Sequence, residues 1–310
     1  MKSKFKNIAG CLTAVFFIPF VITLILNGVG LEKDKIGLAL LSGVTGNREA
    51  KNTVTMSYPV GTEEMDIDEY IIGVLVPAYD YCVNDEFVKT MAVMCRTYIK
   101  YCNAKGIMCN AKFYTDTGME ERWGEEWEKK KASITALVEQ TKGEYLTCGG
   151  EVIYPYFHML TSGYTRNLRE PAAYLCEVVQ TEDSLEEGYI SVAEFTDKEF
   201  AALLKKNISG LYFDDSGAAS QLQIIEKTTG GYVVFIQAGN IIVDGDSFCD
   251  MLGLASPSFT YSATEGGIRF TVKGQGYGYG LSVAGAKHRA ENGTSYREIL
   301  NYYFENIDWK

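Results

Sequence analysis

The pattern of hydrophobic and polar positions separates a short apolar segment near the N-terminus from a long segment of mixed character. Residues 8–26 are almost wholly apolar, and no charged residue occurs between Asn7 and Leu31. A helix of about 20 apolar residues spans the ~30 Å hydrocarbon core of a bilayer. Three lysines precede the segment, whereas Glu32 and Asp34 follow it, which indicates an N-terminus in the cytoplasm. We therefore predict a membrane anchor.

A cleaved signal peptide is the alternative interpretation of this segment. Its apolar region would be about 7–15 residues long and would end at a small-x-small site. The apolar run is longer than that, and Leu26-Asn27-Gly28 is a poor cleavage site. The sequence thus predicts a cytoplasmic tip and transmembrane helix in residues 1–31, with residues 8–29 in the membrane. A tether over residues 32–51 and an extracytoplasmic domain over residues 52–310 follow.

The domain predicted from residue 52 onward mixes helical and strand patterns without regular alternation. Helical spacing of apolar positions predicts helices at residues 67–76, 84–106, 120–142, 195–206, 247–252, 281 onward and 296–303. Strands are predicted at residues 53–62, 222–227, 232–238 and 268–272, with a hairpin that turns at Gly149-Gly150. Thr196, and Ser295 together with Glu298, are typical helix caps. This mixture indicates an α+β fold in which most strands are antiparallel.

Charge and composition narrow the range of functions. The chain carries 29 Lys and Arg against 40 Asp and Glu, a net charge of −11. Binding to nucleic acid is dominated by cationic contacts to phosphate, so this balance argues against a nucleic-acid partner. A hydrophobic fraction of 46% and only six prolines fit a folded domain rather than a stalk.

Residues that commonly bind metals are few. Seven of the eight cysteines follow the predicted anchor, no C-x-x-C pair occurs, and the two histidines are His158 and His288. Disulfides form outside the cytoplasm, but the spacing of these cysteines shows no framework. We predict no cofactor, with zinc left as an alternative. His288 lies in a charged helical stretch and is expected to be solvated.

Four segments of the chain resemble, in order, the motifs of one protein family. Residues 69–98 read EYIIGVLVPAYDYCVNDEFVKTMAVMCRTY, and residues 141–165 read TKGEYLTCGGEVIYPYFHMLTSGYT. Residues 245–259 read GDSFCDMLGLASPSF, and residues 274–300 begin with GQGYGYGLSVAGA. These segments resemble the stage II sporulation protein D family, also called amidase-enhancer domains, and their order and spacing extend the resemblance over roughly residues 52–305.

The resemblance implies an enzyme of the cell wall that is anchored in the cell membrane. Studied members of the family are lytic transglycosylases of endospore-forming bacteria. They cut peptidoglycan glycan strands stripped of stem peptides, beside an amidase, while the mother cell engulfs the forespore. The reaction needs a general acid whose pKa is raised by burial. The C6 hydroxyl of muramic acid then traps the oxocarbenium-like centre in place of water, so one glutamate can suffice. The implied location of the domain is the space between mother cell and forespore.

Three positions depart from the family motifs. The presumed acid of the family, the Glu of an E-M-P triplet, corresponds to Ala78, which has no proton to donate. The His of a G-H-G triplet corresponds to Tyr277, and the Gln of an M-S-Q triplet corresponds to Val283. General acid catalysis contributes ~10²–10⁴ in rate, so the loss of the acid predicts a catalytically degenerate relative.

The resemblance also implies a set of substrate-binding residues, namely Arg96, His158, Ser162, Tyr277 and Ser282. Asp80, and after it Glu86, are the carboxylates that could replace the missing acid. Asp80 lies two residues from Ala78, so on a helix it points in another direction, and on a strand it is displaced by ~6–7 Å. A nucleophilic pair of Cys82 with His158 also stays open.

Two main hypotheses follow from the sequence. In the first, the domain binds peptidoglycan glycan strands or a partner amidase, with other engulfment proteins as further partners, and does not cut. In the second, the domain is an active lytic transglycosylase that uses a substitute carboxylate such as Asp80. The sequence therefore leaves enzymatic activity open. A structural membrane protein that binds neither glycan nor amidase is the third alternative.

Overall fold

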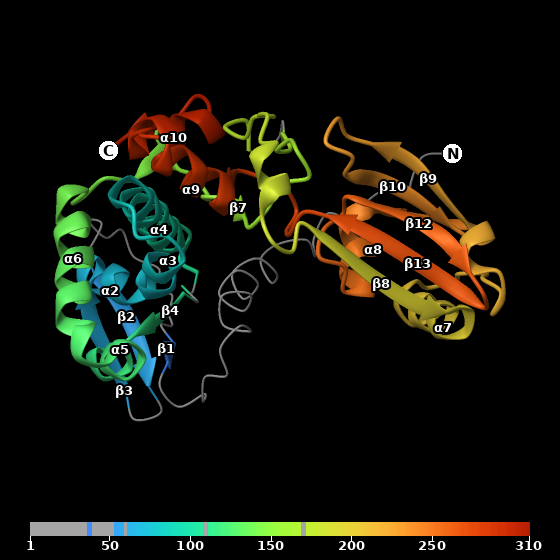
Figure 1. Ribbon diagram of the computed structural model, residues 1–310, viewed down its shortest axis with the longest axis horizontal. Coiled ribbons are helices and arrows are strands. Elements are labelled where there is room, and N and C mark those ends of the chain that lie inside the picture. Colours follow the sequence, from blue (N-terminus) through green and yellow to red (C-terminus); the bar gives the residue numbers. More distant parts are fainter. Residues whose placement is uncertain (1–35, 39–52, 59–60, 108, 110, 169–171) are drawn as a thin grey trace. The chain divides into compact units, whose positions relative to one another are not determined.

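The computed structural model describes residues 36–38, 53–58, 61–107, 109, 111–168 and 172–310 (Figure 1). They form two compact units. The first unit comprises residues up to Tyr81 together with Ile99–Lys142, and the second unit comprises Cys82–Tyr98 and Gly143–Lys310. The predicted membrane segment lies outside the described residues, and none of the described helices is long and apolar enough to cross a membrane. The predicted bounds of tip, tether and domain stay predictions.

The first unit contains two antiparallel strand pairs and a group of helices. The pairs are β2 (Thr53–Tyr58) with β3 (Gly61–Asp66), and β1 (Ile36–Leu38) with β4 (Lys112–Tyr114). The helical elements are α2 (Ile67–Val74), α3 (Val76–Tyr81), α5 (Asp116–Trp123), the 3₁₀ turn η2 (Gly124–Glu126) and α6 (Trp127–Gln140). The last residues of α4 (Asp85–Lys105) also belong to this unit.

Two helices predicted as continuous are interrupted in the first unit. The helix predicted over 67–76 ends as α2 at Val74, and a second helix, α3, begins at Val76, because Pro77 lacks the backbone N–H that would continue the helical bonding and its ring crowds the carbonyl four residues earlier. The helix predicted over 120–142 begins at Asp116 and is divided into α5 and α6 at Gly124, whose φ is +56°. The division of the first predicted helix places Ala78 and Asp80 together on the short helix α3.

The second unit holds most of the strands. Three antiparallel three-stranded sheets have the orders β11-β10-β9, β12-β13-β8 and β15-β5-β6, and β14 pairs with β7 in parallel. The strands are β5 (Leu146–Cys148), β6 (Glu151–Val152), β7 (Phe157–His158), β8 (Ile190–Thr196), β9 (Leu222–Lys227), β10 (Val233–Ala238), β11 (Ile241–Asp244), β12 (Phe259–Thr264), β13 (Gly267–Lys273), β14 (Leu281–Ser282) and β15 (Asp308–Trp309). The helical elements are the start of α4, η3 (Glu182–Leu185), α7 (Asp197–Asn207), η4 (Ala218–Gln221), α8 (Gly245–Leu252), α9 (Val283–Glu291) and α10 (Tyr296–Tyr303).

An aromatic cluster forms the core between α7, α8 and the strands of the second unit. Phe200 of α7 and Phe248 of α8 are fully buried, as is Phe270 of β13. The ring centroids of Phe200 and Phe270 lie 5.7 Å apart, and those of Phe248 and Phe270 lie 6.2 Å apart. Buried aromatic side chains stabilise a fold through their large apolar area and through ring–ring contacts. This cluster holds the β12-β13-β8 sheet against the helices.

The predicted α+β class with mostly antiparallel strands is confirmed. The hairpin at Gly149-Gly150 joins β5 to β6, and both glycines have positive φ. The capping boxes at Thr196 and at Ser295 with Glu298 are present. Strand β8 was not predicted, because its exposed and half-buried positions alternate without a fully buried residue. The helix predicted from residue 195 begins at Asp197, after this strand.

Candidate functional site

A glycine-rich turn connects β13 to β14 and lies against β7. Gly278 and Gly280 have φ values of +78° and +70°, which L side chains rarely adopt. A Cβ at Gly280 would overlap the carbonyl oxygen of Tyr156, and one at Gly278 would overlap the ring of Tyr232. The turn therefore packs more closely than any side chain allows at these positions, and it fixes the backbone of Tyr277 and Tyr279 between the glycines.

His158 is held by this turn. Its side chain is 1% exposed, and its Nδ1 lies 3.0 Å from the carbonyl oxygen of Tyr279. Because a carbonyl only accepts, this contact assigns the proton to Nδ1. Burial lowers the pKa of His158 to about 4, so the ring is neutral at physiological pH. The lone pair of Nε2 is buried and has no hydrogen-bond partner among the described residues.

Ser282 begins α9 and contacts a carboxyl group that the sequence did not single out. Its Oγ accepts from the backbone N–H of Gly285 at 3.1 Å and donates to Oδ2 of Asp183 at 2.6 Å. The backbone N–H of Thr161 donates to the same Oδ2 at 2.7 Å. Asp183 is fully buried, and burial raises its pKa to about 6. No sequence signal identifies Asp183, because its partners are distant along the chain.

Tyr277 belongs to a second cluster, centred on Arg166. The Tyr277 hydroxyl donates to the carboxylate of Asp250, and burial and this carboxylate both raise the pKa of Tyr277, so the hydroxyl keeps its proton. Arg166 Nη1 donates to the Tyr277 carbonyl at 3.1 Å and pairs with Asp246 at 2.7 Å. The guanidinium also lies over the ring of Tyr279, 4.4 Å from its centroid. Arg166 follows the TSGYT stretch directly, which is the one sequence signal that could have indicated it.

Four tyrosines of the second unit form a continuous row, which we call the tyrosine row: Tyr98, Tyr154, Tyr156 and Tyr279. Successive ring centroids lie 6.0, 4.6 and 6.1 Å apart, with the rings edge to face. Each ring is partly exposed. A tyrosine offers an apolar ring face and a polar hydroxyl, which suits a ligand with apolar faces and polar edges, such as a sugar.

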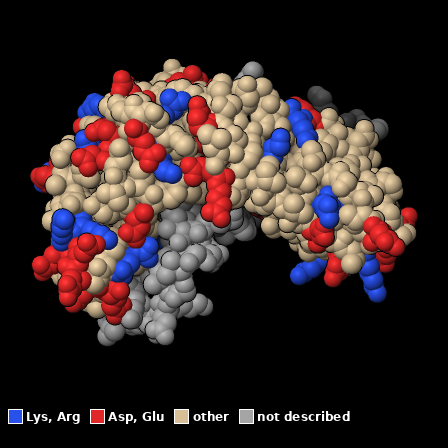
Figure 2. All heavy atoms as spheres, in the orientation of Figure 1, with Lys and Arg blue, Asp and Glu red and all other residues tan. Residues whose placement is uncertain are grey.

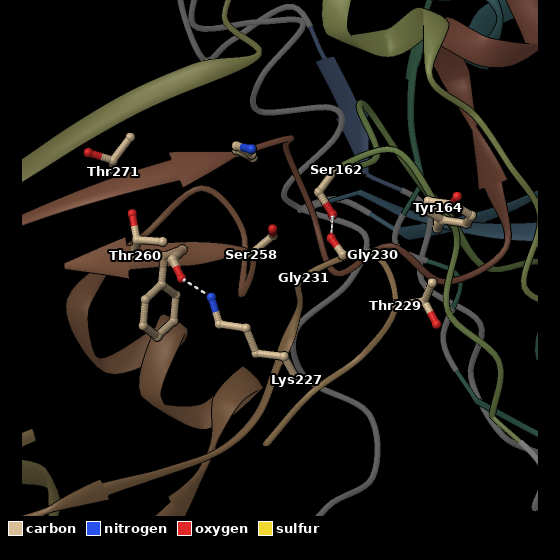
Figure 3. Close-up of a pocket in the computed structure, with 11 residues that line it drawn as sticks. Ser162, Tyr164, Lys227, Thr229, Gly230, Gly231, Ser258, Thr260 and Thr271 are labelled. Carbon is tan, nitrogen blue, oxygen red and sulfur yellow. Dashed lines mark hydrogen bonds between the residues drawn. The ribbon is translucent and has the colours of Figure 1, made fainter. Parts of the chain in front are cut away.

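Ser162 forms its hydrogen bonds with other residues than His158 and Ser282 do. Its backbone N–H donates to the Tyr232 hydroxyl at 3.1 Å, and its Oγ donates to the carbonyl of Gly230. Ser162 and Gly230 are on the wall of a pocket of about 290 Å³ that also includes residues of β9, β12 and β13 (Figure 3). Apart from Arg96, the predicted binding residues thus divide among the glycine-rich turn, the Asp183 contact and this pocket.

Arg96 is placed differently from the other predicted binding residues. Its side chain is 0% exposed, and its Nη1 donates to the backbone carbonyl of Glu144 at 3.0 Å. The neighbouring Thr97 accepts at 3.0 Å from the backbone N–H of Leu146. Both residues of α4 therefore hold the segment that leads into β5.

The two carboxylates considered as substitute acids are both engaged in other contacts. In the first unit, Asp80 accepts from Arg122 Nε and, at 2.7 Å, from Trp123 Nε1. A general acid must carry a proton, whereas both oxygens of Asp80 accept hydrogen bonds from donors. In the second unit, Glu86 pairs with Lys89 at 2.5 Å and accepts from the backbone N–H of Tyr296 at 2.8 Å. Burial raises the pKa of Glu86, but these contacts together outweigh it, and the net effect is a lowered pKa.

Ala78 itself is 8% exposed on α3, and its methyl group has no acid–base chemistry.

The surroundings of Cys82 also disfavour the alternative of a Cys82–His158 nucleophilic pair. Burial, with the nearby carboxylate of Glu291, raises the pKa of Cys82 to about 11. Its Sγ lies 3.9 Å from Oε1 of Glu291. A cysteine nucleophile needs the opposite, a lowered pKa beside a positive group.

A zinc ion would need three or four ligands in tetrahedral geometry. Within the described residues, no group of three or more His, Cys, Asp and Glu side chains could hold a metal ion. His158 presents a suitable lone pair, but it does so alone. His288, expected to be solvated, instead lies partly buried with its Nε2 3.0 Å from Oε1 of Glu186. The residues that the structure describes therefore do not assemble a zinc site.

Comparison with known proteins finds a matching family model and several relatives. The family model described as "Stage II sporulation protein" matches residues 60–148. Stage II sporulation protein D of Bacillus amyloliquefaciens is 27% identical over 263 residues, which are 79% of this chain and 74% of the relative. Stage II sporulation protein D of Bacillus subtilis (strain 168) is 26% identical over 301 residues, 90% of this chain and 85% of the relative.

A further relative shares only a part of the chain. The amidase enhancer of Bacillus subtilis (strain 168) is 32% identical over 83 residues, which are 26% of this chain and 12% of that protein. The matched region of the family model contains Ala78 and the beginning of the hairpin at Gly149. The resemblance seen in the four sequence motifs is thereby confirmed: the chain contains a stage II sporulation protein domain and resembles stage II sporulation protein D over most of its length.

Proposed function

We propose that the chain is a membrane-anchored cell-wall protein that binds peptidoglycan glycan strands and does not cleave them. The observation that carries the proposal is the tyrosine row, which offers four partly exposed rings in succession. A glycan strand presents a succession of sugar rings with C–H groups on their faces and polar groups at their edges. Four rings in succession therefore suit a chain of sugars better than a single small molecule.

The acid–base chemistry of the candidate residues supports binding over cleavage. Ala78 cannot donate a proton, and Asp80 accepts from Arg122 and Trp123. The contacts of Glu86 lower its pKa, which is the opposite of what a general acid needs. We further propose that the membrane segment lies within residues 8–29, that the domain faces the cell wall, and that an amidase and other engulfment proteins act beside it. The name of the amidase-enhancer relative supports the amidase part of this proposal.

The test of binding uses the full chain in mild detergent with peptide-free glycan strands. We expect the strands to co-sediment with the wild-type chain, and we expect Tyr154→Ala with Tyr156→Ala to weaken binding by at least about tenfold, since central aromatic contacts each contribute more than ~1 kcal/mol. Tyr212→Ala is the matched control, because Tyr212 is 80% exposed and lies outside the row. Equal loss in both variants, or no binding by the wild type, would contradict the proposal.

The test of catalysis measures 1,6-anhydro ends on the same strands. We expect none from the wild-type chain and none from Ala78→Glu. In that variant Tyr277 and Val283 still replace the His and the Gln of the family motifs, so the added carboxyl alone does not restore the family's set of groups. Release of such ends by the wild type, abolished by Asp80→Asn, would establish the alternative of an active transglycosylase. Strong release by Ala78→Glu alone would show that only the acid is missing.

A further inference from the structure

The pocket beside Ser162 is lined by two lysines and several hydroxyl groups (Figure 3). Lys227 is the last residue of β9, and Lys273 is the last residue of β13. Thr229, Ser258, Thr260 and Thr271, which carry hydroxyl groups, also line the pocket. A volume of about 290 Å³ is at the small end of ligand pockets and suits a single sugar unit.

The two lysines give this pocket a positive charge that nearby acids do not neutralise. Neither Nζ forms an ion pair with a carboxylate among the residues that the structure describes. Lys227 Nζ donates at 2.8 Å to the carbonyl of Phe259. Burial, and then the charge of Lys273, lower the pKa of Lys227, because the two ammonium groups repel each other. An anion between them would relieve this repulsion.

The rest of the molecule makes such a pocket unusual. The chain has a net charge of −11, and acidic side chains are spread over the face shown in Figure 2, with lysines and arginines among them. On an acidic protein, two adjacent lysines without carboxylate partners need a physical reason. Hydroxyl side chains both donate and accept, which matches the hydroxyl groups of a sugar rather than a bare ion.

We infer that the pocket at Lys227 and Lys273 binds an acidic sugar, with the two ammonium groups on its carboxylate and the surrounding hydroxyls on its ring. The identification of the ligand as a sugar rests on the proposed function, whereas the preference for an anion does not. In a glycan strand without stem peptides, the lactyl group of each muramic acid is a free carboxylate. The pocket would then recognise one sugar of a strand that the tyrosine row binds along its length.

The experiment is calorimetric titration of the full chain in mild detergent with three probes: N-acetylmuramic acid, N-acetylglucosamine and inorganic phosphate. We expect N-acetylmuramic acid to bind and the neutral sugar and phosphate to bind at least about tenfold more weakly. Each charge-assisted contact contributes about a factor of ten, so Lys227→Gln with Lys273→Gln should weaken N-acetylmuramic acid binding by about 100-fold. Raising the salt concentration should weaken it as well.

The matched control is Lys198→Gln with Lys206→Gln, two exposed lysines of α7 that change the net charge equally. This control should bind like the wild type, and circular dichroism should show both double variants folded. Equal binding of the two sugars, binding of phosphate as tight as that of the acidic sugar, or equal loss in both double variants would overturn the inference. If N-acetylmuramic acid binds through the lysines while glycan strands fail to bind, the proposed function fails and the pocket stands.

Discussion

Replacing Gly280 with alanine should lower the free energy of unfolding by about 3 kcal/mol or more. The φ of +70° costs an L residue ~1–2 kcal/mol. The added methyl group would also overlap the carbonyl oxygen of Tyr156, which accepts the backbone N–H of Leu281 at 3.0 Å. The variant must therefore separate β14 from the segment before β7, and the ring contact of Tyr156 with Tyr279 should be lost with it. Glycan binding should fall together with stability.

Gly293 provides the control for this prediction. Its φ is +84°, yet a Cβ there would meet no atom within 4 Å. Gly293→Ala should therefore lower the free energy of unfolding only by the ~1–2 kcal/mol that a positive φ costs an L residue, and it should leave glycan binding unchanged. Thermal unfolding of both variants, followed by tyrosine and tryptophan fluorescence, measures the difference. Equal destabilisation by the two substitutions would show that the close approach of the glycine-rich turn to Tyr156 is not a stabilising feature.

The sequence predicts those parts of the fold that depend on residues close together along the chain. The caps at Thr196 and Ser295 depend on a glutamate three residues later, and the turn at Gly149-Gly150 depends on two adjacent glycines. The interruption at Leu75 is also local, since it follows from Pro77, but the apolar pattern of residues 67–76 concealed it. The parallel pairing of β14 with β7 joins segments more than 120 residues apart, and no local pattern contains it.

The same reasoning explains which site residues were found. His158 and Tyr277 lie in segments that resemble family motifs, so the sequence indicates them. Asp183 contacts Ser282 across 99 residues, and Arg166 contacts Asp246 across 80 residues. The hydrogen bonds that Arg122 and Trp123 donate to Asp80 also depend on tertiary contact, since these partners are more than 40 residues away along the chain. Candidate site residues can therefore be predicted from the sequence. Whether a candidate is free to act as an acid or a ligand depends on hydrogen-bond partners that only the fold brings together.

The buried carboxyl group of Asp183 should make stability depend on pH. The pKa of Asp183 is raised from its ordinary value of 3.8 to about 6, mainly by burial. Because the folded-state pKa exceeds the unfolded one, the contribution to stability is complete below pH 3.8 and is lost as the pH rises through about 6. A shift of this size corresponds to about 3 kcal/mol. Asp183→Asn mimics the neutral carboxyl and should remove this dependence.

We therefore expect the difference in unfolding free energy between Asp183→Asn and the wild type to grow by about 3 kcal/mol from pH ~4 to pH ~7, in favour of the variant. His158 acts in the opposite direction, because its lowered pKa of about 4 destabilises the fold as the pH falls. Its contribution is common to both chains and cancels in the difference. Exposed Asp214→Asn is the control and should show no such growth. A difference that stays constant with pH would mean that Asp183 keeps one protonation state throughout, and that the Ser282 and Thr161 contacts stabilise its charge as fully as water does.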